Sequence, residues 1–163
     1  MAMLAELLAP DTVGPAGHPS PGGRVVVSRF GPIVVGSESL IEVPNGLLGF
    51  GGLRSYALAT LPDERFARFL VLQSLEDDAV AFLVQPLEPS SGLIAPSELE
   101  EACAALGIPF DDLVLLLIVA VRRQGDKAVL SVNLRAPLFV NAARRRAVQH
   151  VLASGSYPVR YVL

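Results

Sequence analysis

The sequence predicts a mostly β protein with short antiparallel strands and one short α-helix at about residues 97–106. With 163 residues the chain has room for one domain of ordinary size. From Arg24 onward, short β-branched and aromatic runs alternate with Gly and Pro, which is typical of antiparallel strands joined by turns. The longest apolar run, LVLLLIVAV at 113–121, is about half of the roughly 20 residues that span a bilayer. We therefore expect a central strand there and no membrane segment.

Residues 1–23 form a segment of different composition. They hold eight Gly or Pro residues and no apolar periodicity after Ala9. A helix over the first nine residues is too short to be stable alone in water. We expect residues 1–23 to be a flexible Gly/Pro-rich arm and residues 24–163 to be the folded domain.

Composition indicates a protein of the cytoplasm. The apolar N-terminus MAMLAELLA carries no Lys or Arg, so it lacks the positive region of a secretory signal. Cys103 is the only cysteine, which excludes an internal disulfide and favours a reducing compartment. Because it lies on the apolar face of SELEEACAALG, we interpret Cys103 as a small core residue.

The first half of the domain reads as a series of strands. Arg24 to Phe30, IVV and LIEV precede the turn-rich PNGLLGFGG, and YALATL, FARFLVLQS and AVAFLVQP follow it. In the run from Phe66 to Leu72, one face carries Phe66, Arg68, Leu70 and Leu72, and the other carries Ala67, Phe69 and Val71. A strand that is largely apolar on both sides, with one charge, favours a closed sheet or one covered on both faces.

The helix is marked at both ends. Ser97 is the expected N-cap after Pro96, Glu100 would complete a capping box, and Gly107 offers a left-handed stop. After it, LVLLLIVAV, a turn at Gly125 and AVLSVNL predict a hairpin.

The periodicity of residues 144–152 is ambiguous. Val148 and Leu152 fit a helix, whereas Val148, His150 and Leu152 also alternate as in a strand. The residues alone leave both open.

No catalytic, cofactor or metal site is predicted. His18 and His150 are the only histidines, and GxSxG, P-loop and GxGxxG motifs are absent. We interpret the acidic pairs 77–78 and 111–112 as solvated residues of turns. The remote alternative is that they serve as the active site of a small metal-dependent enzyme. Arg144, Arg145 and Arg146 read as a solvated face, with direct RNA binding as the alternative.

Charge is unevenly distributed along the chain. Up to Asp112 there are 15 acidic and five basic residues, whereas from Leu113 onward eight basic residues face Asp126 alone. The net charges of these parts, −10 and +7, add to −3. Such a pattern is compatible with a partner of complementary charge.

Four segments in order resemble the family of the flagellar assembly factor FliW. They are IEVPNGLLGFGGLRSYAL, FLVLQSLEDDAVAFLV, SVNLRAPLFVN and AVQHVLASGSYPVRYVL, and the resemblance covers about residues 25–163. It implies an antiparallel β-barrel-like fold, which favours a strand over 144–152. It also implies a non-enzymatic role without cofactors: binding cytoplasmic flagellin and, when free, binding and antagonising the translational regulator CsrA.

The expected chemistry of these partners suggests where they bind. We expect a monomer when free, without direct nucleic-acid or membrane contact, that offers exposed apolar groups to flagellin at Leu47, Leu48 and Phe50. For CsrA, expected to be basic, we expect contacts at Glu76, Asp77 and Asp78, whose replacement by Ala should hardly change stability. The remaining matching positions, interpreted as structural, are Asn45, Gly46, Gly49, Gln73, Ser74, Asn133, Pro137, Asn141, Gln149 and Tyr157.

Overall fold

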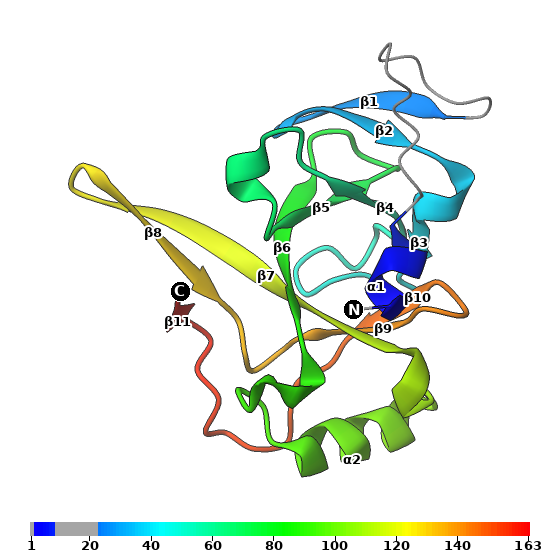
Figure 1. Ribbon diagram of the computed structural model, residues 1–163, viewed down its shortest axis with the longest axis vertical. Coiled ribbons are helices and arrows are strands. Elements are labelled where there is room, and N and C mark those ends of the chain that lie inside the picture. Colours follow the sequence, from blue (N-terminus) through cyan, green and yellow to red (C-terminus); the bar gives the residue numbers. More distant parts are fainter. Residues whose placement is uncertain (1, 9–22) are drawn as a thin grey trace.

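The computed structural model describes residues 2–8 and 23–163, and within them β strands dominate (Figure 1). The helices are α1 (Ala2–Leu7) and α2 (Pro96–Leu106), and short 3-10 turns are η1 (Ser37–Ser39), η2 (Glu64–Phe66), η3 (Pro89–Ser91) and η4 (Phe110–Asp112). The strands are β1 (Arg24–Ser28), β2 (Gly31–Val35), β3 (Leu40–Glu42), β4 (Ser55–Thr60), β5 (Leu70–Ser74), β6 (Ala81–Leu87), β7 (Leu113–Gln124), β8 (Lys127–Val132), β9 (Leu138–Asn141), β10 (Arg146–Gln149) and β11 (Tyr161–Val162).

The large sheet closes on itself. Its strand order is β11-β8-β7-β6-β5-β4-β3-β10-β9, and β9 also pairs with β7, so the strands from β7 round to β9 form a ring. Each pairing in the ring is antiparallel except the short parallel contact between β10 and β3. The predicted β-barrel-like fold and the strand within 144–152 are confirmed.

Strand β7 belongs to two parts of the sheet. Its first residues pair with β9, Leu115 to Ile118 pair with β6, and Val119 to Gln124 pair with β8 in the predicted hairpin. The β7–β8 hairpin projects from the body of the protein (Figure 1). The prediction of a central strand over residues 113–121 is therefore confirmed, since β7 has strand neighbours along both edges.

Apolar clusters cover both faces of the sheet. Leu70, Leu72 and Leu116 belong to the cluster inside the ring. Val71, on the opposite face of β5, packs beneath the separate β1–β2 hairpin. Cys103 is buried with the other apolar residues of α2 against the outside of β7 and β9, as expected for a core residue. The high apolar content is thus accounted for by a sheet buried on both sides.

Two local predictions are wrong. Helix α2 begins at Pro96 with Ala95 as N-cap, and Ser97 makes no capping bond, because proline suits the first helical position, where no N–H is needed. The strand expected from Phe66 begins at Leu70 instead. Asp63 accepts a hydrogen bond from the Arg65 N–H and folds residues 64–66 into a 3-10 turn.

The predicted arm over residues 1–23 lies largely outside the described residues, which omit 1 and 9–22. Within it, α1 packs on the domain, and the Leu7 side chain is fully buried. No helix among residues 2–8 and 23–163 is long and apolar enough to cross a membrane.

Two glycines of the 44–52 loop provide a test of this geometry. Gly46 and Gly49 both have left-handed φ, but a Cβ at Gly46 would lie 2.6 Å from the Gly51 Cα, whereas one at Gly49 meets nothing within 4 Å. We expect Gly46→Ala to lower the free energy of unfolding by about 3 kcal/mol and Gly49→Ala by about 1 kcal/mol, measured by urea denaturation. Equal losses would contradict the close approach of the backbone at Gly46.

Candidate functional site

An apolar hollow lies where four segments of the fold meet. The β1–β2 turn, the 44–52 loop, the turn before β6 and the last part of β7 enclose a volume of about 420 Å³. Arg29 is the one charged residue among the described residues of its lining, which otherwise are Phe30, Phe50, Ala79, Val80, Ala81, Phe82, Leu83, Val119, Ala120 and Val121. A concave apolar surface of this kind can receive the side chains of a protein partner.

Phe50 forms one wall of the hollow. Its ring packs edge-on against Phe82 with the ring centres 5.1 Å apart, and 38% of the residue remains exposed. Leu48 is also exposed, at 60%, but Leu47 is 2% exposed and belongs to the cluster inside the ring. The prediction that Leu47 is an exposed contact residue is therefore wrong, because a tight turn, with the Phe50 N–H bonded to the Leu47 oxygen, directs Leu47 inward.

Gln149 holds this loop in place from the far end of the sequence. Its Oε1 accepts a hydrogen bond of 2.9 Å from the Leu48 N–H, and its Nε2 donates to the Ala136 oxygen. The amide thus ties the loop to the segment before β9, and Leu48 is presented to solvent by a bonded backbone.

The acidic turn borders the same hollow, because Ala79 and Val80 follow it directly. Buried Gln73 shapes the turn by donating from Nε2 to the oxygens of Asp78 and Val80. The Oγ of Ser74 accepts from the N–H groups of Glu76 and Asp77. The turn is therefore held from inside by polar side chains.

Glu76 is a structural carboxylate. Its Oε2 accepts hydrogen bonds from the N–H groups of Ser55 and Arg54 at the start of β4, and these bonds hold the pKa of Glu76 below its ordinary value. The expectation that all three acids can be replaced with little effect on stability does not fit this geometry. All three acids are exposed, but the carboxylates of Asp77 and Asp78 make no bond to β4, and Asp77 Oδ1 accepts only from the N–H of nearby Ala79.

Other positions that match the family pattern also brace loops. Asn133 Oδ1 accepts from the N–H groups of Arg135 and Ala136, and Asn141 Oδ1 accepts from that of Arg144. The Tyr157 hydroxyl accepts from the N–H of Ala95, the N-cap of α2. Their positions follow chain turns and helix ends rather than a shared surface. Asn45 and Gly46 lie in the turn after Val43, and buried Pro137 precedes β9 and accepts from the His150 N–H through its oxygen.

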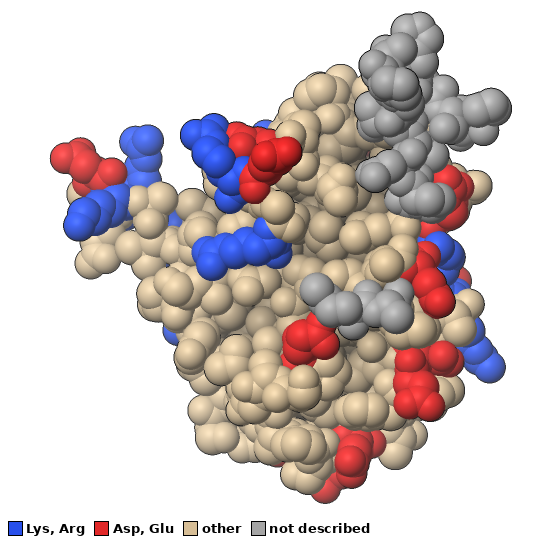
Figure 2. All heavy atoms as spheres, viewed as in Figure 1, with Lys and Arg blue, Asp and Glu red and all other residues tan. Residues whose placement is uncertain are grey.

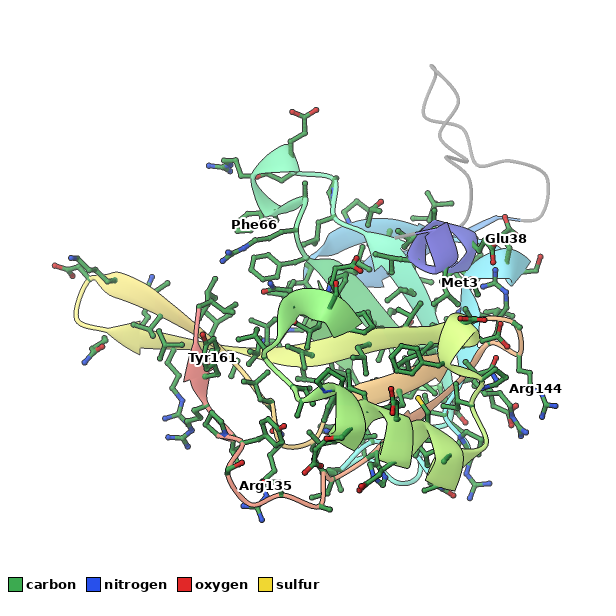
Figure 3. All side chains as sticks on the ribbon, turned by 60° about the horizontal axis from the view of Figure 1, so that its bottom comes forward. Met3, Glu38, Phe66, Arg135, Arg144 and Tyr161 are labelled. Atoms are coloured by element: carbon green, nitrogen blue, oxygen red, sulfur yellow. The ribbon has the colours of Figure 1, made fainter. Side chains whose placement is uncertain are left out.

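The side chains of the three consecutive arginines, residues 144–146, make different contacts. Arg145 donates to the backbone oxygens of Glu6 and Leu7 in α1, and Arg146 forms an ion pair of 3.0 Å with Glu42. Arg144 extends away from the body of the protein (Figure 3). They do not present a single row of free guanidinium groups.

Acidic and basic groups are mixed over most of the visible face of the molecule. Figure 2 shows both kinds on the projecting hairpin, which carries Arg122, Arg123, Asp126 and Lys127, and acidic groups alone only toward the end where α2 lies. Among residues 2–8 and 23–163, no group of three or more His, Cys, Asp or Glu side chains is placed to hold a metal ion.

These features define a class: a small closed β protein whose loops, braced by its own amide side chains, border an apolar hollow. The model of the FliW protein family matches residues 24–163. The chain belongs to the FliW family.

Relatives with the name "Flagellar assembly factor FliW" agree over most of their length. The protein of Syntrophus aciditrophicus is 34% identical over 139 residues, 85% of each chain, and that of Natranaerobius thermophilus is 31% identical over 149 residues, 86% of this chain and 91% of its own. The solved structure "Crystal structure of the flagellar assembly factor FliW" superimposes with a TM-score of 0.63 at 22% identity, covering 85% of this chain and 96% of the other. That structure supports the fold.

The role of Glu76 can be measured through its pH dependence. Since its folded-state pKa is lowered, the stabilisation is present above the ordinary carboxyl pKa and is lost as the pH falls through the lowered value. We expect Glu76→Gln to lower the Tm at pH 7 by several degrees, with the difference from the wild type shrinking toward pH 3. Asp78→Asn is the matched control, and an equal effect of both variants would contradict a structural role specific to Glu76.

Proposed function

We propose that this protein is a non-enzymatic flagellar assembly factor that binds flagellin in the cytoplasm and, when free of flagellin, binds and antagonises CsrA. The support is membership of the FliW family together with the name of its relatives. The observation that carries the proposal is the apolar hollow, with exposed Phe50 on one side and the acidic turn on another.

For flagellin, the hollow offers an apolar anchor point. Terminal segments of flagellin are expected to be helical with an apolar stripe, and such a stripe binds hydrophobic grooves through a few spaced side chains. Phe50 is partly exposed on a firm support, the Phe82 ring, and Leu48 projects from a loop held by Gln149. Aromatic anchors on a rigid base contribute most to binding because little side-chain entropy is lost.

For CsrA, the acidic turn offers electrostatic attraction. An RNA-binding regulator is expected to carry a basic surface, and exposed carboxylates accelerate association with such a surface. Glu76, Asp77 and Asp78 are all exposed, but the carboxylate of Glu76 is engaged by backbone N–H groups at the start of β4. Asp77 and Asp78 are therefore the acids we expect to contact CsrA.

Both surfaces border one hollow, which favours exclusive binding. Val80 and Phe82, on either side of Ala81, line the hollow between the acidic turn and Phe50. A protein seated on Phe50 would therefore cover the approach to the acidic turn. Exclusive binding couples synthesis of flagellin to its export, because CsrA is captured only after flagellin has left.

The alternative of direct RNA binding through residues 144–146 has less support. Two of the three guanidinium groups are engaged within the protein, by α1 and by Glu42. Phosphate contacts would require these bonds to be broken.

Removal of the aromatic anchor tests the flagellin surface. We expect Phe50→Ala to weaken flagellin binding about tenfold in calorimetric titration, since aromatic anchors contribute roughly 1–2 kcal/mol. Phe66→Ala is the matched control, because Phe66 is 44% exposed on η2 and is not among the residues lining the hollow. Unchanged affinity of Phe50→Ala would place the contact elsewhere, and no binding by the wild type would overturn the proposal.

Neutralising the acidic tip tests the CsrA surface. We expect Asp77→Asn combined with Asp78→Asn to weaken CsrA binding several-fold at low salt and much less at high salt, because screening removes the attraction. Asp111→Asn with Asp112→Asn, a second adjacent acidic pair in η4, is the control. Equal losses in the two double variants would indicate a general charge effect and contradict a local contact.

A further inference from the structure

Helix α1 lies in an apolar groove of the domain. Met3, Leu4, Leu7 and Leu8 recur at i, i+1, i+4 and i+5 and pack against the cluster inside the ring, with Leu7 fully buried. Ala5, between them, is exposed. A six-residue helix is thus held by one apolar face, and Figure 3 shows it against the body of the protein, with Met3 labelled.

The helix does not fill its groove. Beside Met3 and Leu4 a volume of about 190 Å³ remains, bounded by the segment from Pro86 to Pro89, which includes Glu88 at its rim, and by the start of β7, Leu113 to Leu115. A longer amphipathic helix could occupy the same groove and this volume as well.

Arg145 receives the C-terminal end of α1. Its guanidinium donates to the Glu6 oxygen at 2.8 Å and to the Leu7 oxygen at 3.4 Å, which are carbonyl groups without a partner inside the helix. Arg145 has φ +52°, a left-handed conformation that is unfavourable for a residue with a side chain. An arginine held in the turn between β9 and β10 thus binds the C-terminal end of the helix.

Helix α1 stands outside the part of the chain that defines the family. The family model begins at residue 24, after α1 and the intervening residues 9–22. Half of those fourteen residues are Gly or Pro, and fully extended they would span about 50 Å. A segment of this length allows α1 to leave the groove while β1 stays paired with β2.

The groove and the hollow of the candidate functional site are separate and lie along the same pair of strands. Phe82 packs against the same interior cluster as Met3 and Leu4, and it also supports Phe50 in the hollow. The groove lies at the Leu87 end of the β6–β7 pair and the hollow at the Phe82 end.

We propose that α1 is a displaceable internal occupant of a helix-binding groove. The groove receives an amphipathic helix of a partner protein with apolar residues at i, i+1, i+4 and i+5 and its C-terminal end at Arg145, and α1 leaves when that helix binds. An isolated helix of six residues is marginal in water, so attachment to the chain supplies its effective concentration. The choice of flagellin as the partner rests on the proposed function, whereas the groove does not.

The first experiment compares flagellin affinity among full-length variants. Leu7→Glu and the milder Leu4→Ser weaken the apolar face of α1, and Ala5→Glu places a charge on its exposed side as the control. We expect the first two to bind flagellin on the order of tenfold tighter than the wild type, since the competing closed state is removed, and Ala5→Glu to bind equally. Wild-type or weaker affinity in both variants would overturn the proposal.

The second experiment needs no flagellin. A peptide of residues 1–9 with an amidated C-terminus is titrated into ¹⁵N-labelled full-length Leu7→Glu protein, which reports folding at the same time. We expect chemical-shift changes at Leu87 and Leu115, none with a peptide that itself carries Leu7→Glu, and weaker binding to the wild type. Absence of shifts at these residues in a folded variant would overturn the groove.

The two experiments separate this proposal from the proposed function. If neither the wild type nor any variant binds flagellin while the peptide binds the groove, flagellin is the wrong partner and the proposal of a helix-binding groove is retained. If flagellin binds the wild type and the α1 variants with equal affinity and the peptide does not bind, the proposal of a helix-binding groove is wrong and the proposed function is retained.

Discussion

Closure of the sheet by the pairing of β7 with β9 is the constraint on which the rest of the structure depends. Leu115 and Leu116 have strand neighbours on both edges, β6 on one and β9 on the other. Leu116 consequently faces the interior cluster, and Leu115 faces the cluster under α2. Beyond Ile118 the strand leaves the ring and pairs with β8, so the same strand lines both the α1 groove and the hollow near Phe50. The rigidity of one strand thereby sets the distance between the two surfaces.

Amide and hydroxyl side chains convert this closed sheet into a support for loops. Gln73, Asn133 and Gln149 each bond to backbone groups of turns, and Gln149 reaches a residue 101 positions away. A buried amide must find partners, and backbone groups of irregular loops must do so as well. Each amide and each loop group thus satisfies the other. The bond from the Leu48 N–H to Gln149 therefore fixes the backbone of the loop although the Leu48 side chain is exposed. A partner binding there has little ordering entropy to overcome.

The sequence predicted those features that depend on neighbouring residues. The hairpin at Gly125, the end of α2 at Gly107 and the doubly buried β5 follow from turn chemistry and alternation, and all are present. Burial of Leu47, the engagement of Glu76 and the docking of α1 were not predictable in this way. Each depends on a contact between distant segments, such as the Arg145 guanidinium with the end of α1. The secondary-structure propensity of a few neighbouring residues carries no information on such contacts. For the same reason the sequence predicted only a flexible arm at the start of the chain and not the packing of α1 on the domain.

The single parallel contact of the ring has a consequence for how the protein folds. Strands β4 to β8 follow one another along the chain as antiparallel neighbours, so their contacts join residues much closer in sequence than those of the β3–β10 contact. Joining β3 to β10 instead brings Glu42 to Arg146, 104 residues away, through one register pair, a backbone bond and an exposed ion pair. Contacts between distant residues carry a large entropic cost and form late. The ring is thus closed between β3 and β10 by few contacts, and we expect the sheet to open first there during unfolding.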